Sequence, residues 1–338
     1  MTDVGPTLRG SPEDFIVEEI PLYAPTGEGG HTFVWIEKRL RNTEEVARAL
    51  AHAAGVAPRD VGYAGRKDRV ALARQWFSVP GLDPVLALAL ELPGARVLEA
   101  LRHPHKLRTG QLRGNRFEIV VRGVTGPLAA RAAARLEEGL QRGLPNRFGE
   151  QRFGRDGGNA AAGLALLRGE TLTGRGRRPP DRRALRFAVS ALQAAVFNEA
   201  LRRRELPLDA LEQGDVAVVH VSGGLFLVED AAVEGPRATR REVSATGPIF
   251  GTKTLAPAGE PAAREREALA AAGLDPEAKL PSVPGLRLRG SRRALRMLPT
   301  EASAVHEGEA LRLRFTLPAG SYATVLLEEV LGTAPESA

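Results

Sequence analysis

The sequence predicts an α+β protein built as two lobes. Its 338 residues exceed the length of one ordinary domain and can bury two hydrophobic cores. Strand-like runs of alternating apolar and polar residues occur beside stretches with helical spacing. Hydrophobic residues make up 43% of the chain, as in globular proteins. Together these observations indicate an α+β fold.

Strands and helices are both expected in the first part of the chain. A turn at 11–14 leads into the first strand. A helix begins at Thr43, because acidic residues lie near its start and Ala, Val and Leu recur at helical spacing. The expected strands are 15–20, 32–37, 70–79 and 117–122, and the expected helices are 43–54 and 128–142. Alternation along strand 117–122 and the residues just before it predicts one face that carries Asn115, Phe117, Ile119 and Val121.

The character of the chain changes after Gly154. A short helix, a loop at 173–180 and a long helix at 182–204 follow. The runs 215–221 and 225–228 predict a hairpin. The apolar stripe of the long helix comprises Leu185, Ala188, Leu192, Val196 and Ala200. The remaining expected elements are a helix at 261–272, a strand at 310–317 and a last helix at 324–331.

The chain lacks several common features. It has no cysteine, which excludes disulfides, thiolate catalysis and cysteine-ligated metals. The first ten residues contain no apolar signal core, and no run approaches the roughly 18 apolar residues of a membrane span. We therefore expect a cytoplasmic protein that binds no membrane.

The charge balance favours a polyanionic partner. The net charge is +6 and the isoelectric point is about 10.1. Of the 47 basic residues only five are lysine, at positions 38, 67, 106, 253 and 279. Because arginine dominates so strongly, Lys67, beside Asp68, and Lys106, in the basic segment 103–108, are candidates for a specific role, with chance as the alternative.

One carboxylate stands out among the charged residues. Asp68 lies in a Gly-bounded turn between Lys67 and Arg69, two residues after Arg66. The neighbouring cations favour an ionised carboxylate, which suits a nucleophile better than a general acid. The alternative is a solvated surface cluster without chemistry.

Six segments resemble one protein family, the TruD family of tRNA pseudouridine synthases. They occur in the family's order and extend over nearly the whole chain. The segments are 13–19 (Glu-Asp-Phe-Ile-Val-Glu-Glu), 65–68 (Gly-Arg-Lys-Asp), 114–117 (Gly-Asn-Arg-Phe), 145–154, 190–198 and 317–324.

The resemblance implies a pseudouridine-synthase-like catalytic domain with a mixed, largely antiparallel sheet. Residues 1–155 and 299–338 would form this discontinuous domain. Residues 156–298 would form a second α+β domain inserted into it, with a basic cleft between the two.

The resemblance also implies the reaction, which converts uridine to pseudouridine in tRNA, at position 13 of the D arm. The reaction breaks the N1–C1′ bond, turns the base and joins C5 to C1′, so it requires no redox step, metal or other cofactor. In the family the aspartate of the Gly-x-Lys-Asp motif is catalytic, and this role carries over to Asp68. A carboxylate can attack C1′ or take a sugar proton, and both routes stay open.

Further motif residues are candidates for binding the flipped uridine. The family's Asn-x-Phe motif implies that Phe117 stacks on the base and that Asn115 meets the uracil edge, where an amide can donate and accept. From the residues alone, Phe117 is equally an ordinary core residue. Phe15 and Tyr322 also match aromatic positions of the family's motifs. Each is expected either to line the pocket or to be an ordinary core residue. Lys67 is expected to order the Asp68 site or to bind a phosphate, with a solvent-facing lysine as the alternative.

A set of basic residues is expected to contact backbone phosphates, an interaction that carries no sequence information. For Arg152, the alternative is that segment 151–154 forms a structural hinge. The candidates are Arg66, Arg69, His103, His105, Lys106, Arg108, Arg147 and Arg152.

The six histidines show no metal-ligand spacing, so we expect no metal site. The expected partner is tRNA, bound by a monomer. A non-catalytic RNA-binding or RNA-remodelling protein on the same fold is one alternative, and the same chemistry on another RNA is a second. An exposed carboxylate in an RNA site favours the enzyme, because it would repel phosphate in a mere binder.

Overall fold

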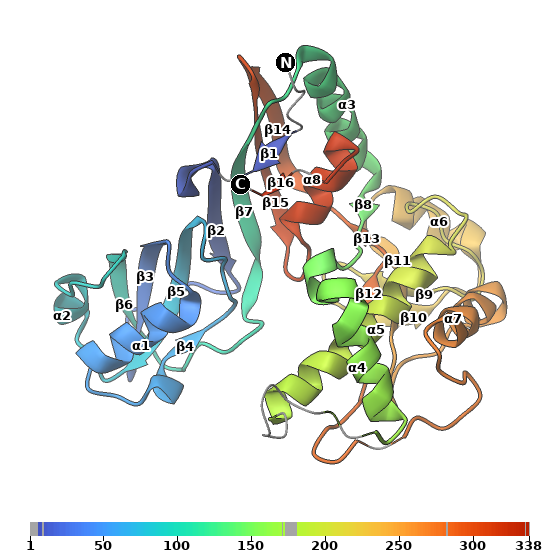
Figure 1. Ribbon diagram of the computed structural model, residues 1–338, viewed down its shortest axis with the longest axis horizontal. Coiled ribbons are helices and arrows are strands. Elements are labelled where there is room, and N and C mark those ends of the chain that lie inside the picture. The colour runs from blue at the N-terminus through green and yellow to red at the C-terminus, as the bar shows by residue number, and fades with distance from the viewer. Residues whose placement is uncertain are drawn as a thin grey trace. The chain divides into compact units, whose positions relative to one another are not determined.

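The computed structural model describes residues 6–8, 10–170, 172, 181–281, 283–334 and 336–337. The predicted loop at 173–180 lies outside these residues. The chain divides into two compact units (Figure 1). The first comprises Met1–Leu140, Pro299–Ala323 and Leu327–Ala338, and the second comprises Gln141–Leu298 and Thr324–Leu326. Residues 141–155 thus group with the second unit, and the assignment of 156–298 as an inserted domain remains a prediction.

The first unit is built on a mixed, largely antiparallel sheet, as predicted. Along its main path only the pair β2–β5 is parallel. The path runs β14 (Thr300–Glu307), β15 (Ala310–Pro318), β7 (Leu112–Arg122), β2 (Phe15–Pro21), β5 (Leu72–Pro80), β3 (His31–Arg39) and β6 (Ala95–His103). The short strands β1 (Thr7–Leu8), β4 (Gly62–Tyr63) and β16 (Glu336–Ser337) pair beside this path.

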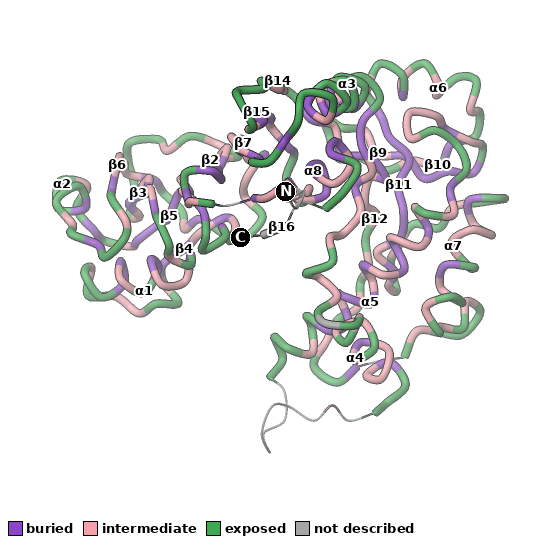
Figure 2. The backbone as a smooth tube through the Cα atoms, turned by 45° about the horizontal axis from the view of Figure 1, so that its top comes forward, coloured by how far each residue is buried: buried purple, intermediate pink, exposed green. Residues whose placement is uncertain are grey.

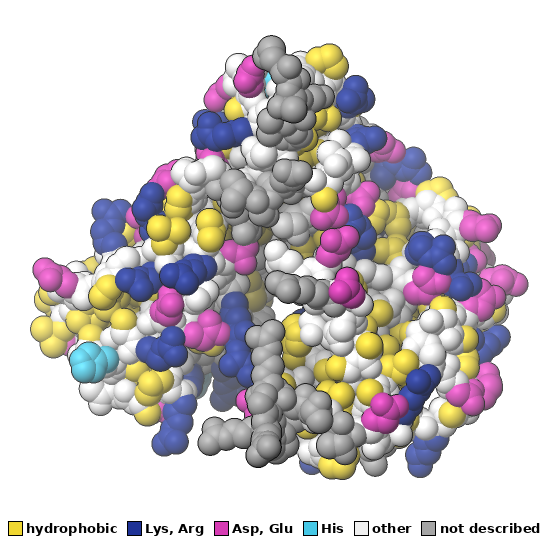
Figure 3. All heavy atoms as spheres, in the orientation of Figure 1, with side chains coloured by type: hydrophobic (Ala, Val, Ile, Leu, Met, Phe, Trp, Pro, Cys, Tyr) yellow, Lys and Arg dark blue, Asp and Glu magenta, His cyan; other side chains and the backbone are white. Residues whose placement is uncertain are grey.

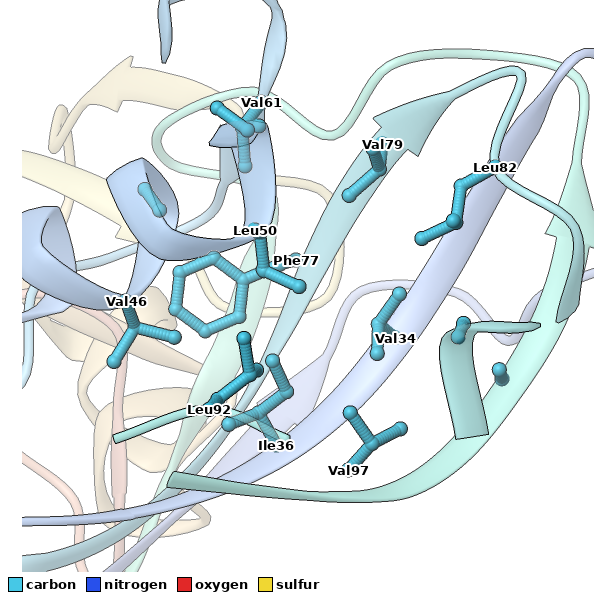
Figure 4. Packing of buried hydrophobic residues seen from close by; sticks show 14 residues of the cluster. Val34, Ile36, Val46, Leu50, Val61, Phe77, Val79, Leu82, Leu92 and Val97 are labelled. Carbon is cyan, nitrogen blue, oxygen red and sulfur yellow. The ribbon is translucent and has the colours of Figure 1, made fainter. Parts of the chain in front are cut away.

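Helix α1 (Thr43–Ala53) packs on this sheet over β3 and β5. Figure 4 shows the apolar residues between them, among which Val34, Ile36, Leu50 and Phe77 are fully buried. The apolar residues whose spacing predicted the helix are therefore the ones that contact the core. The other helices that include residues of this unit are α2 (Pro84–Leu88), α3 (Gly126–Arg142) and α8 (Ala323–Leu331), beside short 3₁₀ turns at Pro12–Asp14 and Pro58–Asp60.

The second unit contains a four-stranded sheet with helices. The strand order is β10 (Leu225–Leu227), β9 (Val216–Val219), β11 (Val243–Ile249) and β12 (Ser291–Ala294). Figure 2 shows that β11 is almost entirely buried. A two-stranded sheet pairs β8 (Leu144–Pro145) with β13 (Arg296–Met297), and short 3₁₀ turns occupy Glu150–Arg152 and Arg155–Gly157. The helices are α4 (Gly158–Leu167), α5 (Arg182–Arg202), α6 (Ala231–Thr239) and α7 (Gly259–Ala271).

The predicted helices and the predicted hairpin of the second unit are present. The hairpin forms from β9 and β10. On α5 the predicted stripe faces the core, with Leu185 half-buried at its start and Ala188, Leu192, Val196 and Ala200 buried. The side chain of Asn198 on this helix accepts a hydrogen bond from the main-chain N of Phe148 at 2.8 Å and donates to its carbonyl at 2.9 Å. This contact joins two of the motif segments and is structural.

Candidate active site

Asp68 lies in the irregular segment 64–71, which connects β4 to β5. Its side chain is exposed, whereas Lys67 immediately before it is buried. The Asp68 carboxylate is thus exposed to solvent, while the neighbouring Lys67 extends into the protein interior.

Lys67 forms a buried ion pair with Glu19 of β2. Its Nζ lies 2.7 Å from Oε2 of Glu19, and the two side chains are 5% and 1% exposed. The other carboxylate oxygen of Glu19 accepts a hydrogen bond from the main-chain N of Trp76 at 3.3 Å. Burial raises the pKa of Glu19, and the Lys67 ammonium opposes that rise. Lys67 is therefore not solvent-facing, and its ammonium ties segment 64–71 to the sheet.

Side-chain hydrogen bonds hold the main chain of the same segment. The N of Lys67 donates to Oγ1 of Thr43 at 2.9 Å, and that hydroxyl donates to Oε1 of Gln75 at 2.9 Å. The amide of Gln75 in turn donates to the carbonyl of Gly65 at 3.0 Å. Because Thr43 and Gln75 are buried, these bonds form where water does not compete for the polar groups.

A second buried lysine, Lys38 of β3, reaches Asp68 directly. Its Nζ donates to the main-chain carbonyl of Asp68 at 2.6 Å and to that of Arg41 at 2.7 Å. None of the sequence motifs assigns Lys38 to the site. The available signal was the strand alternation, which places Lys38 on the same face of β3 as the core residues Val34 and Ile36.

Asn115 on β7 carries an unsatisfied polar atom. Its Oδ1 is buried and has no hydrogen-bond partner in the described part of the chain. In the sheet Asn115 lies opposite Glu19 of β2 and opposite Leu317 of β15. Directly opposed residues share one face, so Asn115 neighbours the ion pair that anchors Asp68. A buried amide oxygen without a partner is costly unless a ligand satisfies it.

Phe117 follows on the same face of β7 and is 7% exposed. Its ring packs against Phe15, with centroids 6.1 Å apart, and against Phe315 at 5.3 Å. Phe15 is also buried. Both rings therefore belong to the packed face of the sheet, and their contact with substrate remains a prediction.

Tyr322 is half-buried and directly precedes α8. It follows the end of β15 by a short turn, in which the N of Ala319 donates to the carbonyl of Arg113 at 2.9 Å. Since Leu317 of β15 opposes Asn115, this turn lies at the same end of the sheet as the amide.

Four of the predicted phosphate contacts are exposed residues of the first unit, namely Arg66, Arg69, His105 and Arg108. Arg66 pairs with Glu44 at 2.6 Å, and Nε of Arg69 donates to the carbonyl of Leu40 at 3.4 Å. Lys106 is half-buried, and its Nζ donates to the carbonyl of Arg59 at 2.5 Å. On the face of the molecule in Figure 3, basic and acidic side chains are interspersed.

His103 differs from these residues because it is buried. Its ring stacks on Tyr23 with centroids 5.1 Å apart and contacts Phe33 at 4.4 Å. Burial lowers the pKa of His103, which favours the neutral ring. A buried neutral imidazole is a poor phosphate contact, so we exclude His103 from the proposed set.

The last two phosphate candidates, Arg147 and Arg152, lie in the second unit and are half-buried. Nη2 of Arg152 donates to Oγ of Ser190 at 2.8 Å, and its guanidinium lies 5.1 Å from the ring centroid of Phe187. These contacts link the segment 151–154 to α5 within the second unit, and the phosphate and hinge roles both remain predictions.

Two features are absent from the described residues. None of their helices is long and apolar enough to cross a membrane. No group of three or more His, Asp or Glu side chains among them is arranged to hold a metal ion.

Comparison with solved structures identifies the fold class. The chain superposes on the crystal structure of a putative tRNA pseudouridine synthase D from Methanosarcina mazei with a TM-score of 0.75 and 24% identity, over 98% of this chain and 94% of that one. The fold is therefore that of a pseudouridine synthase.

Comparison of sequences identifies the family. The family model for tRNA pseudouridine synthase D (TruD) matches residues 1–173 and 181–330. The enzyme of this name from Geobacter metallireducens is 41% identical, over 97% of this chain and 95% of that one. The one from Thermus thermophilus is 44% identical, over 97% and 89%. The chain belongs to the TruD family of tRNA pseudouridine synthases. It is an isomerase, which removes the non-catalytic alternative.

The buried pair allows a prediction about stability. Lys67→Met should lower the free energy of unfolding of the first unit by about 3–5 kcal/mol, because it leaves the Glu19 carboxylate buried without its partner. Combining Lys67→Met with Glu19→Gln should cost less than the sum of the two single substitutions. Urea unfolding followed by tryptophan fluorescence measures this, since both tryptophans, Trp35 and Trp76, lie in the first unit.

The control is Arg66→Met, at the exposed neighbouring cation, which should change the unfolding free energy by no more than about 0.5 kcal/mol. Strictly additive costs would contradict the coupling of Lys67 with Glu19. A loss of tRNA affinity without loss of stability in Lys67→Met would assign Lys67 to phosphate binding instead.

Proposed function

We propose that Asp68 is the catalytic carboxylate and that the target is uridine 13 in the D arm of tRNA. The observation that carries the assignment of Asp68 is its setting. An exposed carboxylate is held through its own main chain by buried lysines, one paired with Glu19 and one bonded to its carbonyl. Such anchoring fixes a reacting group while its side chain faces outward.

Asn115 and the aromatic residues complete the proposed site. The unpartnered Oδ1 of Asn115 can accept the N3–H of a flipped uracil, whose edge alternates acceptor and donor groups. Phe117, Phe15 and Tyr322 would form the wall against which the base is held. Asp68 would then attack C1′ or take a sugar proton as the N1–C1′ bond breaks. After the base has turned, C5 would bond to C1′ while the Asp68–C1′ ester breaks or the sugar proton returns, and C5 would finally release its own proton.

Cations of both units would bind the backbone of the RNA. Arg66, Arg69, Lys106 and Arg108 are proposed contacts in the first unit, with His105 beside them, and Arg147 and Arg152 are proposed contacts in the second. We also propose that residues 156–298 contribute most to the choice of RNA, because the residues assigned to chemistry all lie outside them. A cytoplasmic monomer that acts without a cofactor completes the proposal.

Asp68→Asn tests the catalytic assignment. The substitution keeps the size of the side chain and removes its charge, so turnover should fall at least about a thousandfold while tRNA affinity is kept or improved. Single-turnover pseudouridine formation and filter binding measure the two quantities. Asp60→Asn, the same change in the preceding 3₁₀ turn, should leave both unchanged. Retention of more than a small fraction of activity in Asp68→Asn would show that another group carries the reaction.

Asn115→Ala tests recognition of the uracil edge. It should lower kcat/KM by about 10- to 100-fold, since one hydrogen bond to the base is lost. The melting temperature should hardly fall, because Oδ1 makes no hydrogen bond within the described protein. A large drop in melting temperature with normal kcat/KM would make Asn115 a structural residue.

The target position is tested on paired transcripts. Pseudouridine mapping after incubation with the enzyme should find the modification at uridine 13, and a transcript with cytidine there should remain unmodified at every other uridine. Modification elsewhere in the control transcript would assign the same chemistry to a different site or RNA.

A further inference from the structure

Lys38 is an unusual residue because its side chain is completely buried. Buried lysines are normally paired with a carboxylate. Within the described ranges Lys38 forms no ion pair, and its ammonium instead donates to two main-chain carbonyls. Nothing in the catalytic chemistry requires this cation, so its burial calls for another explanation.

The two carbonyls belong to segments that the sheet does not connect. Arg41 follows the end of β3 and precedes α1, whereas Asp68 lies 30 residues beyond Lys38 in the segment before β5. The distances of 2.7 Å and 2.6 Å are those of strong charge-assisted hydrogen bonds. Lys38 therefore fixes the main chain of Asp68 relative to the rigid strand β3.

We propose that Lys38 is a positioning residue that orients the Asp68 carboxylate through its main-chain carbonyl. This inference rests on the proposed catalytic role of Asp68. Because Lys38 is buried, it cannot reach the RNA. Its removal should therefore slow the reaction without weakening tRNA binding.

The charges that face Lys38 come from two elements. Lys67 and Asp68 lie in the segment before β5, and Glu44 and Glu45 lie in the first turn of α1. Burial lowers the pKa of Lys38 to about 8, against the attraction of Asp68. As pH rises through this value the ammonium loses its proton, and the bond to the Asp68 carbonyl loses its charge assistance. The single-turnover rate should then decline above about pH 8.

The experiment compares single-turnover rates and tRNA affinities of the full-length protein and four variants. Lys38→Met should reduce the rate by about 10- to 100-fold at unchanged affinity, the size expected for a misplaced reacting group. Lys38→Arg should recover part of the rate and lack the decline above pH 8, since arginine stays protonated. Asp68→Asn should be inactive.

Thr32→Val provides the matched control. Thr32 lies on the same face of the same strand, is fully buried, and donates to the main-chain carbonyl of Leu82, far along the chain from Asp68. Its loss should cost stability and leave the rate unchanged. An equal rate loss in Thr32→Val would show that any damage to β3 has the same effect, which overturns the inference.

A normal rate in Lys38→Met, or a rate loss explained by weaker tRNA binding, would also overturn it. If Lys38→Met does not fold, Lys38→Arg decides, because an alkaline decline that persists in this variant contradicts the role of Lys38. An active Asp68→Asn would overturn the proposed catalytic role itself, whereas an inactive Asp68→Asn with a normal Lys38→Met would overturn only the role of Lys38.

Discussion

Two lysine ammonium groups buried beneath one exposed segment are the constraint on which the candidate site depends. A buried cation is costly unless it is fully satisfied. Lys67 is satisfied by Glu19, and Lys38 by the carbonyls of Asp68 and Arg41. If the segment 64–71 moved away, the ion pair of Lys67 with Glu19 would break, and Lys38 would lose one of its two carbonyl partners, that of Asp68. The position of the segment, and with it that of Asp68, therefore follows from electrostatics in the protein interior.

The sheet supplies the partners from neighbouring strands. Glu19 comes from β2, Gln75 from β5 and Asn115 from β7. The parallel pairing of β2 with β5 covers only 16–18 and 72–74. Beyond it the Glu19 carboxylate accepts the main-chain N–H of Trp76. The candidate site thus lies beside the point where the pairing of β2 with β5 ends, and the Glu19 side chain there takes the place of a backbone partner.

Local patterns predicted much of this fold, and long-range pairing accounts for what they missed. Alternation placed Asn115, Phe117, Ile119 and Val121 on one face, which the burial of β7 confirms. The strands β6 and β14 were not predicted. In β14 (Thr-Glu-Ala-Ser-Ala-Val-His-Glu) too few large apolar residues alternate to give a signal. The pairing of Glu19 with Lys67, 48 residues apart, depends on the sheet register, and so does the burial of His103 under Tyr23. Neither could be read from neighbouring residues.

We propose that the target uridine contacts two residues, Asp68 on the anchored segment 64–71 and Asn115 on β7. A crystal structure of the Asp68→Asn protein bound to unmodified tRNA tests it most directly, because the substrate would be captured before reaction. The account predicts a uridine flipped out of the D arm, with its C1′ in contact with the side chain at position 68 and its uracil edge hydrogen-bonded to Oδ1 of Asn115. A uridine that stays stacked in the RNA, or that lies on another part of the protein, would contradict it.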